Sequence, residues 1–148
     1  CYLLACELSE YFAAIAPVAA SMFDTVSCDP KSEVSIIAFN SINDENILYN
    51  GPSEADTSAE MKTLPVEKVI NMWVNNFNCV HLRTSDSSSF QKISYINKNG
   101  TEIILYKMLS GGHSWPGGEK LRKFADNPVK NVSATDIIWD FFKSNPKR

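Results

Sequence analysis

The chain has little glycine, little histidine and no long hydrophobic run. Shortages of this kind limit the classes of protein to which it can belong. Only six glycines and two histidines occur among its 148 residues. No apolar run approaches the roughly 18–20 residues that a membrane-spanning helix needs, so no transmembrane segment is predicted. The net charge of −3 supplies no basic surface for nucleic acid or for an anionic membrane. Neither kind of partner is therefore expected.

The four cysteines lack the spacing of a metal site. There is no C-x-x-C pair and no pair of nearby histidines, so no zinc site and no cofactor is predicted. Cys1 and Cys6 fall in a predicted helix, where we expect small core residues. Cys28 and Cys79 lie in polar connections, and the sequence leaves open whether they form a disulfide, which depends on their separation in space.

The pattern of hydrophobic residues predicts one layered α/β domain, or part of a larger one. Apolar residues at helical spacing predict helices over residues 1–12, after Pro65 and after Ser133. Strands are predicted by short apolar or β-branched runs. A strand within the run over residues 13–20 should end near Pro17, and further runs cover residues 34–39, 91–97 and 102–108. The last two flank an Asn-Gly pair, which favours a hairpin between them.

The remaining segments are predicted to be connections. They are residues 27–32, a polar excursion over 50–64, a serine-rich loop over 82–89 and an irregular stretch over 121–131. Glycine, proline and small polar residues gather in most of them, as is typical of loops.

The segment GGHSWPGG, residues 111–118, concentrates the glycine of the chain. It holds four of the six glycines and one of the two histidines, His113. Such density indicates a loop bent to present a side chain. Histidine is the residue type most often used to move protons near neutral pH, and catalytic groups of α/β enzymes follow strand ends. His113 is therefore a candidate general base, with an inert surface turn as the alternative.

A carboxylate stands in a comparable place on another strand. Asp44 follows the predicted strand over residues 34–39, as His113 follows the strand over 102–108. Because the carboxyl ends of parallel strands converge on one edge, we expect the two side chains to meet. An aspartate there would fix the tautomer of a catalytic histidine. Taken alone, Asp44 fits equally well as a turn or capping residue.

Several segments resemble the polyhydroxybutyrate depolymerase and feruloyl esterase family of α/β-hydrolases. The resemblance rests on residues 4–9, 12–19, 95–108, 112–118 and 133–142. It implies a mostly parallel sheet with flanking helices, the C-terminal part of that fold. Residues 1–148 would be one partial domain, truncated upstream of Cys1. The family places its G-x-S-x-G nucleophile elbow there, and no such motif occurs in this sequence.

The resemblance also implies an activity and its residues. The whole protein would be a secreted or periplasmic serine esterase, cleaving polyhydroxybutyrate-type polyester or feruloyl or acetyl esters of plant polysaccharide. Asp44 and His113 would be its acid and base, although Asn40-Ser41 replaces the family's His-Gly pair beside the acid. Trp115 and Tyr49 would contact substrate, with packing on its own loop the alternative for Trp115.

A second hypothesis comes from the absent serine. As it stands, the chain would be a non-catalytic module that binds carbohydrate or another partner through Trp115 and nearby aromatic residues. A sheet without its first strands would also expose an edge and an apolar helix face, so we expect the isolated chain to aggregate.

Overall fold

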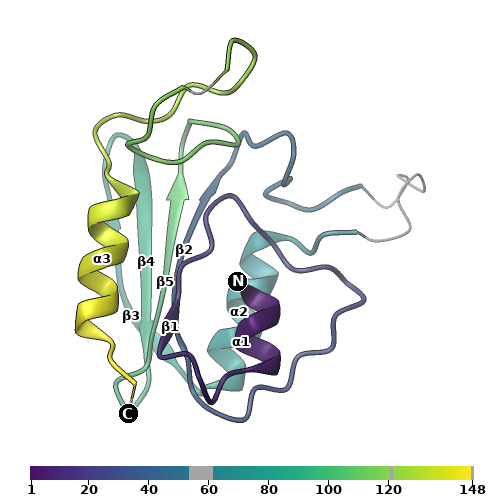
Figure 1. Cartoon of the computed structure of the whole chain (residues 1–148), viewed down its shortest axis with the longest axis vertical. Helices are drawn as coiled ribbons and strands as arrows, with labels where there is room; N and C mark the ends of the chain where they lie inside the picture. Colours follow the sequence, from purple (N-terminus) through teal and green to yellow (C-terminus); the bar gives the residue numbers. More distant parts are fainter. Residues whose placement is uncertain (54–61, 121, 148) are drawn as a thin grey trace.

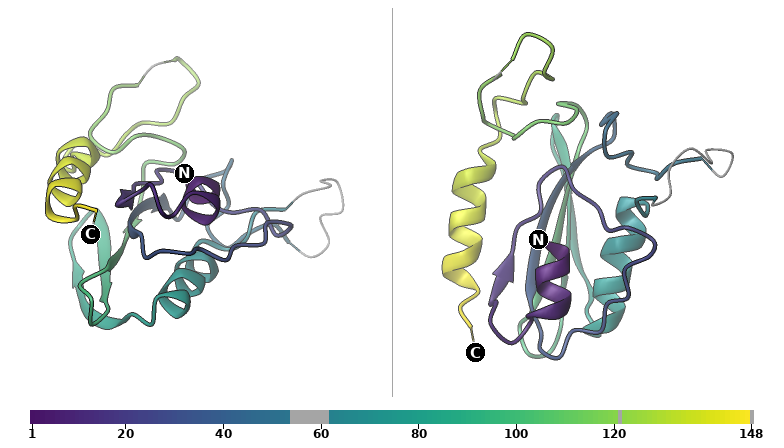
Figure 2. Two further views of the ribbon diagram at one scale, coloured as in Figure 1. Left: turned by 60° about the horizontal axis from the view of Figure 1, so that its bottom comes forward. Right: turned by 45° about the vertical axis from the view of Figure 1, so that its right-hand side comes forward.

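A computed structural model describes residues 1–53, 62–120 and 122–147. Helix α3 covers one face of a five-stranded sheet, and α1 and α2 cover the other (Figures 1 and 2). The predicted order of helices and strands is largely confirmed. The elements are α1 (Tyr2–Glu7), β1 (Ala14–Ile15), β2 (Ser35–Ser41), α2 (Val66–Asn76), β3 (Val80–Asp86), β4 (Phe90–Ile96), β5 (Glu102–Met108) and α3 (Ala134–Ser144).

The sheet is mixed, and the expectation of a mostly parallel sheet is wrong. Its strand order is β1-β2-β5-β4-β3. β1 and β5 both run parallel to β2, whereas β4 is antiparallel to β5 and to β3. Tight turns join β4 to β3 and to β5, and the predicted β4–β5 hairpin turns at Gly100 with φ +80°. Only the β1, β2 and β5 half has the expected parallel arrangement.

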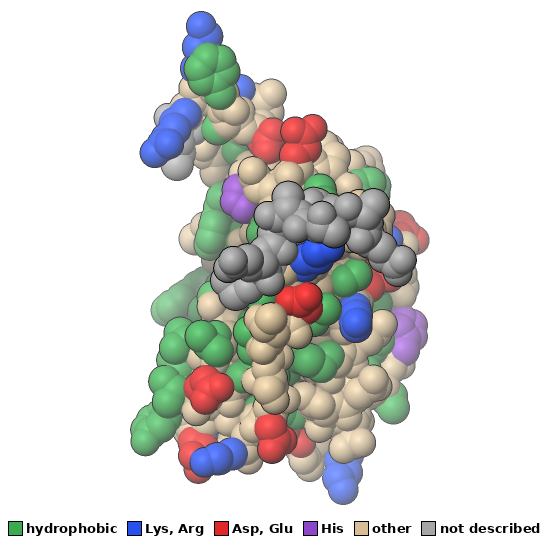
Figure 3. Space-filling model, turned by 90° about the vertical axis from the view of Figure 1, so that its right-hand side faces the viewer, with side chains coloured by type: hydrophobic (Ala, Val, Ile, Leu, Met, Phe, Trp, Pro, Cys, Tyr) green, Lys and Arg blue, Asp and Glu red, His purple; other side chains and the backbone are tan. Residues whose placement is uncertain are grey.

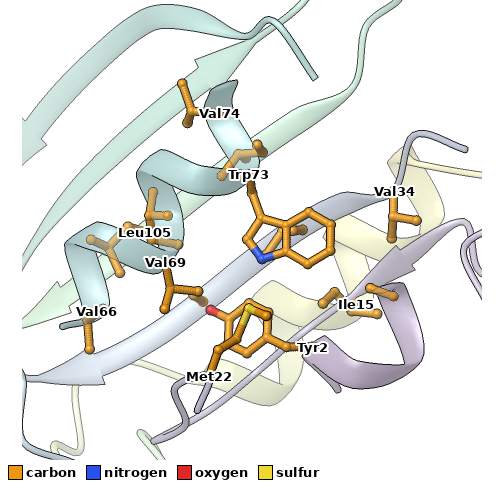
Figure 4. Close-up of a cluster of buried hydrophobic side chains, with 14 of the residues drawn as sticks. Tyr2, Ile15, Met22, Val34, Val66, Val69, Trp73, Val74 and Leu105 are labelled. Atoms are coloured by element: carbon orange, nitrogen blue, oxygen red, sulfur yellow. The ribbon is translucent and has the colours of Figure 1, made fainter. Parts of the chain in front are cut away.

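Alternate residues of the central strands enter two separate cores. Ile36 of β2 and Leu105 of β5 face α1 and α2, while Ile37 and Ile104 face α3. Successive side chains of a strand point to opposite faces of the sheet, and both faces of β2 are covered. All seven of its residues are therefore buried. Figure 4 shows the larger core, in which Trp73 of α2 lies against Tyr2 of α1.

The two long helices begin where the sequence predicts. α2 starts directly after Pro65, which lacks the N–H that a first turn would leave unpaired. α3 is capped by Ser133, whose Oγ accepts a 3.3 Å hydrogen bond from the Asp136 N–H. α1 is shorter than expected and ends at Glu7. β1 ends at Ile15, which agrees with the prediction that this strand ends near Pro17.

The predicted serine-rich loop over residues 82–89 is wrong for most of its length. Residues up to Asp86 belong to β3, an edge strand paired with β4 along one side only. Six of the seven β3 residues are exposed, so no buried alternation marks the strand in the sequence. Hydrogen bonds to β4 impose the extended conformation instead.

Two predicted connections extend beyond what the structure describes. Of the polar excursion over 50–64, residues 54–61 lie outside the described residues, as does Leu121 of the irregular stretch. Residues 122–131 form no helix or strand, as expected. None of the described helices combines the length and the apolarity that crossing a membrane requires.

The disulfide of the described chain joins Cys6 to Cys28, whereas Cys79 is a buried free thiol. The pairing of Cys28 with Cys79 that the sequence left open is thus not formed. Cys6 lies on α1, and the connection after β1 brings Cys28 back beside it, a proximity that sequence spacing does not show.

Removing this disulfide should cost about 3 kcal/mol of unfolding free energy, because it closes a loop of 22 residues. The comparison is a urea titration of the protein with Cys6→Ala and Cys28→Ala combined. Cys1→Ala, at an exposed free cysteine, is the matched control and should change little. Equal midpoints for all three proteins would contradict the assignment.

Alkaline pH should destabilise the fold through Cys79. Burial, together with the negative charge of Glu33, raises the pKa of this thiol from 9.0 to about 11. The unfolded chain then loses the proton first, so stability falls as pH rises from about 9 to about 11. Urea titrations at pH 8 and pH 10.5 should show a smaller loss in Cys79→Ala than in the unchanged protein. Equal losses of stability in the two proteins would exclude Cys79 as the source of the pH dependence.

Candidate active site

Asp44 and His113 lie at the carboxyl ends of two adjacent parallel strands. The β2–β5 register pairs Ser41 with Met108, the last residue of each strand. Asp44 follows in the turn after β2, and His113 follows in the loop after β5 (upper part of Figure 1). The Ile42 N–H donates to the Met108 carbonyl over 3.0 Å, so the ladder continues into the first turn. The fold therefore brings both connections to one edge of the sheet.

The predicted proximity of the two side chains is confirmed. Nδ1 of His113 lies 3.0 Å from Oδ2 of Asp44, across 69 residues of sequence. The Asp44 side chain is fully buried, whereas that of His113 is 42% exposed. The other carboxylate oxygen, Oδ1, accepts hydrogen bonds from the N–H groups of Asn46 and Ile47 at 2.8 and 2.9 Å. Three donors thus satisfy the buried carboxylate and fix its orientation.

Glycine conformations shape the loop that carries His113. Gly111 and Gly112 have φ +106° and +56°, a region that other residues rarely adopt. Two side chains hold the backbone that follows. Oδ1 of Asn43 accepts a 3.1 Å hydrogen bond from the Gly112 N–H, and Oδ2 of Asp126 accepts one of 2.7 Å from the His113 N–H. The imidazole therefore extends from a restrained backbone.

This arrangement prepares the imidazole to accept a proton. A carboxylate accepts hydrogen bonds, so the contact to Asp44 requires the proton of a neutral His113 on Nδ1. Nε2 then carries the lone pair, and it has no hydrogen-bond partner among the residues that the structure describes. Because the side chain is partly exposed, Nε2 is available to a group outside these residues. An orienting acid and a free basic nitrogen are two parts of a nucleophile-activating triad.

The third part is not found among the described side chains. Ser114, the nearest serine in sequence, donates its hydroxyl hydrogen to the Gly111 carbonyl over 2.6 Å. Ser41, on the neighbouring strand, donates its own to Oδ1 of Asn43 over 2.5 Å. Both hydroxyls serve to shape the turns around the Asp44–His113 pair.

Trp115 is half-exposed on the far side of the same loop. Its indole Nε1 donates a 3.0 Å hydrogen bond to Oγ1 of Thr135, in the first turn of α3. The side chain is 45% exposed, so part of the ring remains open to solvent. This contact joins the indole to α3 rather than to its own loop, and a role of Trp115 in substrate binding stays a prediction.

The structure places Tyr49 in the core, and its role in substrate binding stays a prediction. Only 5% of the residue is exposed, and its hydroxyl donates to Glu67 of α2 over 3.0 Å. Burial raises the pKa of Tyr49 well above its ordinary value, and the Glu67 contact adds to the effect. Lys107 also donates to Glu67, over 2.9 Å, and holds the pKa of that carboxyl below its usual range. The Tyr49 phenol thus joins the connection after β2 to α2, and Lys107 joins β5 to the same carboxylate.

A surface hollow borders the loop of His113. Its volume is about 440 Å³, and Asn43, Gly112 and Asp126 contribute to its wall. A hollow of similar volume, about 460 Å³, lies at the opposite end of the sheet near Ser35 and Thr101. The second one is far from Asp44 and His113 along both strands, so only the first adjoins the candidate site.

Two residues of this site were not anticipated from the sequence. Asn43 lies within the acid turn and Asp126 within the irregular segment after the glycines, and both hold the His113 loop through backbone amides. The only sequence signal for them was the glycine pair, since two adjacent glycines indicate a closely approached backbone. No protein-family model matches the chain, and none of the curated proteins searched matches it either.

Proposed function

We propose that this chain supplies the acid and the base of a serine-type carboxylic ester hydrolase. The observation that carries the proposal is the 3.0 Å contact between the buried Asp44 carboxylate and Nδ1 of the partly exposed His113. The family that the sequence resembles, with its polyhydroxybutyrate depolymerases and feruloyl esterases, uses a Ser-Asp-His triad. Asp44 and His113 correspond to its acid and base.

In the proposed mechanism a serine hydroxyl attacks the carbonyl carbon of the ester. Nε2 of His113 takes the hydroxyl proton as the new C–O bond forms, and Asp44 stabilises the resulting imidazolium. The imidazolium gives the proton to the leaving alcohol as the old ester bond breaks. Water then hydrolyses the acyl-enzyme by the same proton transfers. The serine belongs to residues outside this sequence.

Two features of the fold support a nucleophile arriving from the β1 side. β1 is an edge strand, paired with β2 alone among the described strands. The first turn of α1 faces the same end of the molecule as the carboxyl ends of β2 and β5 (Figure 1). By the resemblance, the elbow leads into α1, which would direct the serine toward Nε2.

Exposed hydrophobic side chains lie beside that edge. Leu3, Leu4, Leu8 and Tyr11, on α1 and just after it, are 42–79% exposed. Figure 3 shows hydrophobic side chains gathered at the lower left of the face it presents. An apolar surface of this kind next to an open edge suits coverage by further strands or helices.

The test is an active-site label on the full protein. A fluorophosphonate probe should modify one serine that lies outside these 148 residues, and the protein should hydrolyse p-nitrophenyl butyrate. Mass spectrometry locates the label. A label on a serine of the printed sequence, or neither labelling nor hydrolysis, would contradict the proposal.

A further inference from the structure

Asp126 approaches the candidate base from outside the Asp44–His113 pair. It belongs to the irregular segment between the glycine-rich loop and α3, and its Oδ2 accepts the His113 N–H over 2.7 Å. We propose that Asp126 is a positioning residue that holds the His113 backbone so that the imidazole stays on Asp44. Its consequence for catalysis rests on the proposed function, whereas the contact and its effect on the imidazole do not.

The neighbouring glycine makes this approach possible. A Cβ built on Gly112 would collide with the carboxylate and Cβ of Asp126, so only glycine leaves space there. Gly112 also has φ +56°, which a residue with a side chain rarely adopts. One glycine therefore serves two purposes: it turns the chain and admits the carboxylate to the next N–H.

The loop is held from two sides. Asn43, the neighbour of Asp44 in the acid turn, accepts the Gly112 N–H over 3.1 Å. Asp126 accepts the very next amide, that of His113. Two consecutive backbone amides thus donate to acceptors on different segments. These contacts fix the position and the orientation of the His113 backbone. Without Asp126, two flexible glycines precede the base and the His113 N–H loses its acceptor, while the Asn43 contact and the Ser114 hydroxyl on the Gly111 carbonyl remain.

A hydrogen-bond acceptor, rather than a negative charge, is what this role requires. Asp126→Asn keeps an amide oxygen that can accept the His113 N–H, whereas Asp126→Ala removes it. Asp140 is the matched control, since its carboxylate is exposed and pairs with Lys143 on the surface of α3. Asp140→Ala should leave the site unchanged, because exposed ion pairs contribute little.

The first experiment measures His113 directly in the full protein labelled with ¹⁵N-histidine, its signals assigned by their loss in His113→Gln. In Asp126→Ala, the His113 amide should exchange about tenfold faster, the change that corresponds to one lost hydrogen bond. The ring nitrogens should shift from one tautomer, with the proton on Nδ1, to a mixture. Asp126→Asn and Asp140→Ala should match the unchanged protein. Unaltered exchange and tautomer in Asp126→Ala would overturn the proposal.

The second experiment measures ester hydrolysis in the same proteins. Misplacing a base by about 1 Å can cost about 100-fold, so Asp126→Ala should lower kcat by about 10–100-fold. KM should stay within about twofold, and Asp126→Asn should restore most of kcat. A purely structural loss would not follow this pattern of rescue. If the unchanged protein hydrolyses no ester, the proposed function fails, and the exchange and tautomer results still decide the positioning role.

Gly112→Ala provides an independent check. Its side chain would displace the Asp126 carboxylate, so it should reproduce the faster His113 amide exchange of Asp126→Ala. Combining both substitutions should add little to that exchange rate, because each breaks the same contact. Fully additive effects would contradict a shared contact.

Discussion

If the proposed function holds, His113→Ala is expected to lower kcat for p-nitrophenyl ester hydrolysis by about 10⁴-fold or more, as loss of the base does in Ser-His-Asp enzymes. The serine would have no group to take its proton, while the surfaces that bind the ester would be unchanged. KM should therefore change far less than kcat. Steady-state kinetics of the full protein over a range of ester concentrations separates the two constants.

Asp44→Asn tests the other half of the pair. An amide in place of the carboxylate can donate its N–H to Nδ1 and so favour the wrong tautomer of His113. We therefore expect kcat to fall by about 10⁴-fold. The substitution preserves size, and the Asn oxygen can still accept from the Asn46 and Ile47 amides. A folded protein with low activity is thus expected, and circular dichroism checks the fold.

The second histidine of the chain is the matched control. His81 lies on the exposed edge strand β3, where its Nε2 pairs with Thr84 at 2.8 Å. His81→Ala should leave kcat within about twofold, as expected for a surface change away from the site. Comparable losses from His81→Ala and His113→Ala, or full activity in His113→Ala, would exclude the proposed mechanism.

Trp73→Ala should produce the largest loss of stability, about 3–5 kcal/mol, as is typical of a buried tryptophan. The side chain is fully buried between α2 and α1, with its ring centroid 6.3 Å from that of Tyr2 and 5.5 Å from that of Phe77 (Figure 4). Its removal leaves a cavity at the centre of the larger core. Urea titration followed by circular dichroism gives the free energy of unfolding.

Two further tryptophan variants sharpen this prediction. Among the described residues, the buried Nε1 of Trp73 has no hydrogen-bond partner, so Trp73→Phe removes volume and also an unpaired polar group. It should cost clearly less than Trp73→Ala. Trp139 of α3 is 63% exposed, and Trp139→Ala should change stability by about 0.5 kcal/mol or less. Equal losses from Trp73→Ala and Trp139→Ala would show that the larger core is not where stability resides.

Local signals in the sequence predicted the central parts of the fold. The all-apolar run of β2, the Asn-Gly hairpin before β5, and the starts of α2 at Pro65 and α3 at Ser133 each depend on a short stretch of residues. They were predictable because the features that create them lie within a few positions of one another. β3 was missed for the opposite reason, since an exposed strand buries no regular set of side chains.

The residues of the candidate site likewise include some that the sequence predicted and some that it did not. Asp44 and His113 were selected from the sequence because each follows a predicted strand, and the family resemblance indicated the same two residues. The burial of Tyr49 was not predicted, because nothing in its neighbourhood along the sequence shows that Glu67 of α2 and Lys107 of β5 lie against it. Asp126 was not anticipated, because its role depends on the curvature of a loop without regular structure.

The sequence by itself determined most of the helices and strands, and it identified an acid and a base that each follow a strand. The tertiary structure alone decided that the sheet is mixed, that Cys6 rather than Cys79 pairs with Cys28, and that Asp126 restrains His113. The physical reason is distance along the chain. Helix starts and strand burial come from neighbouring residues, whereas these three features require the packed chain to bring remote segments together.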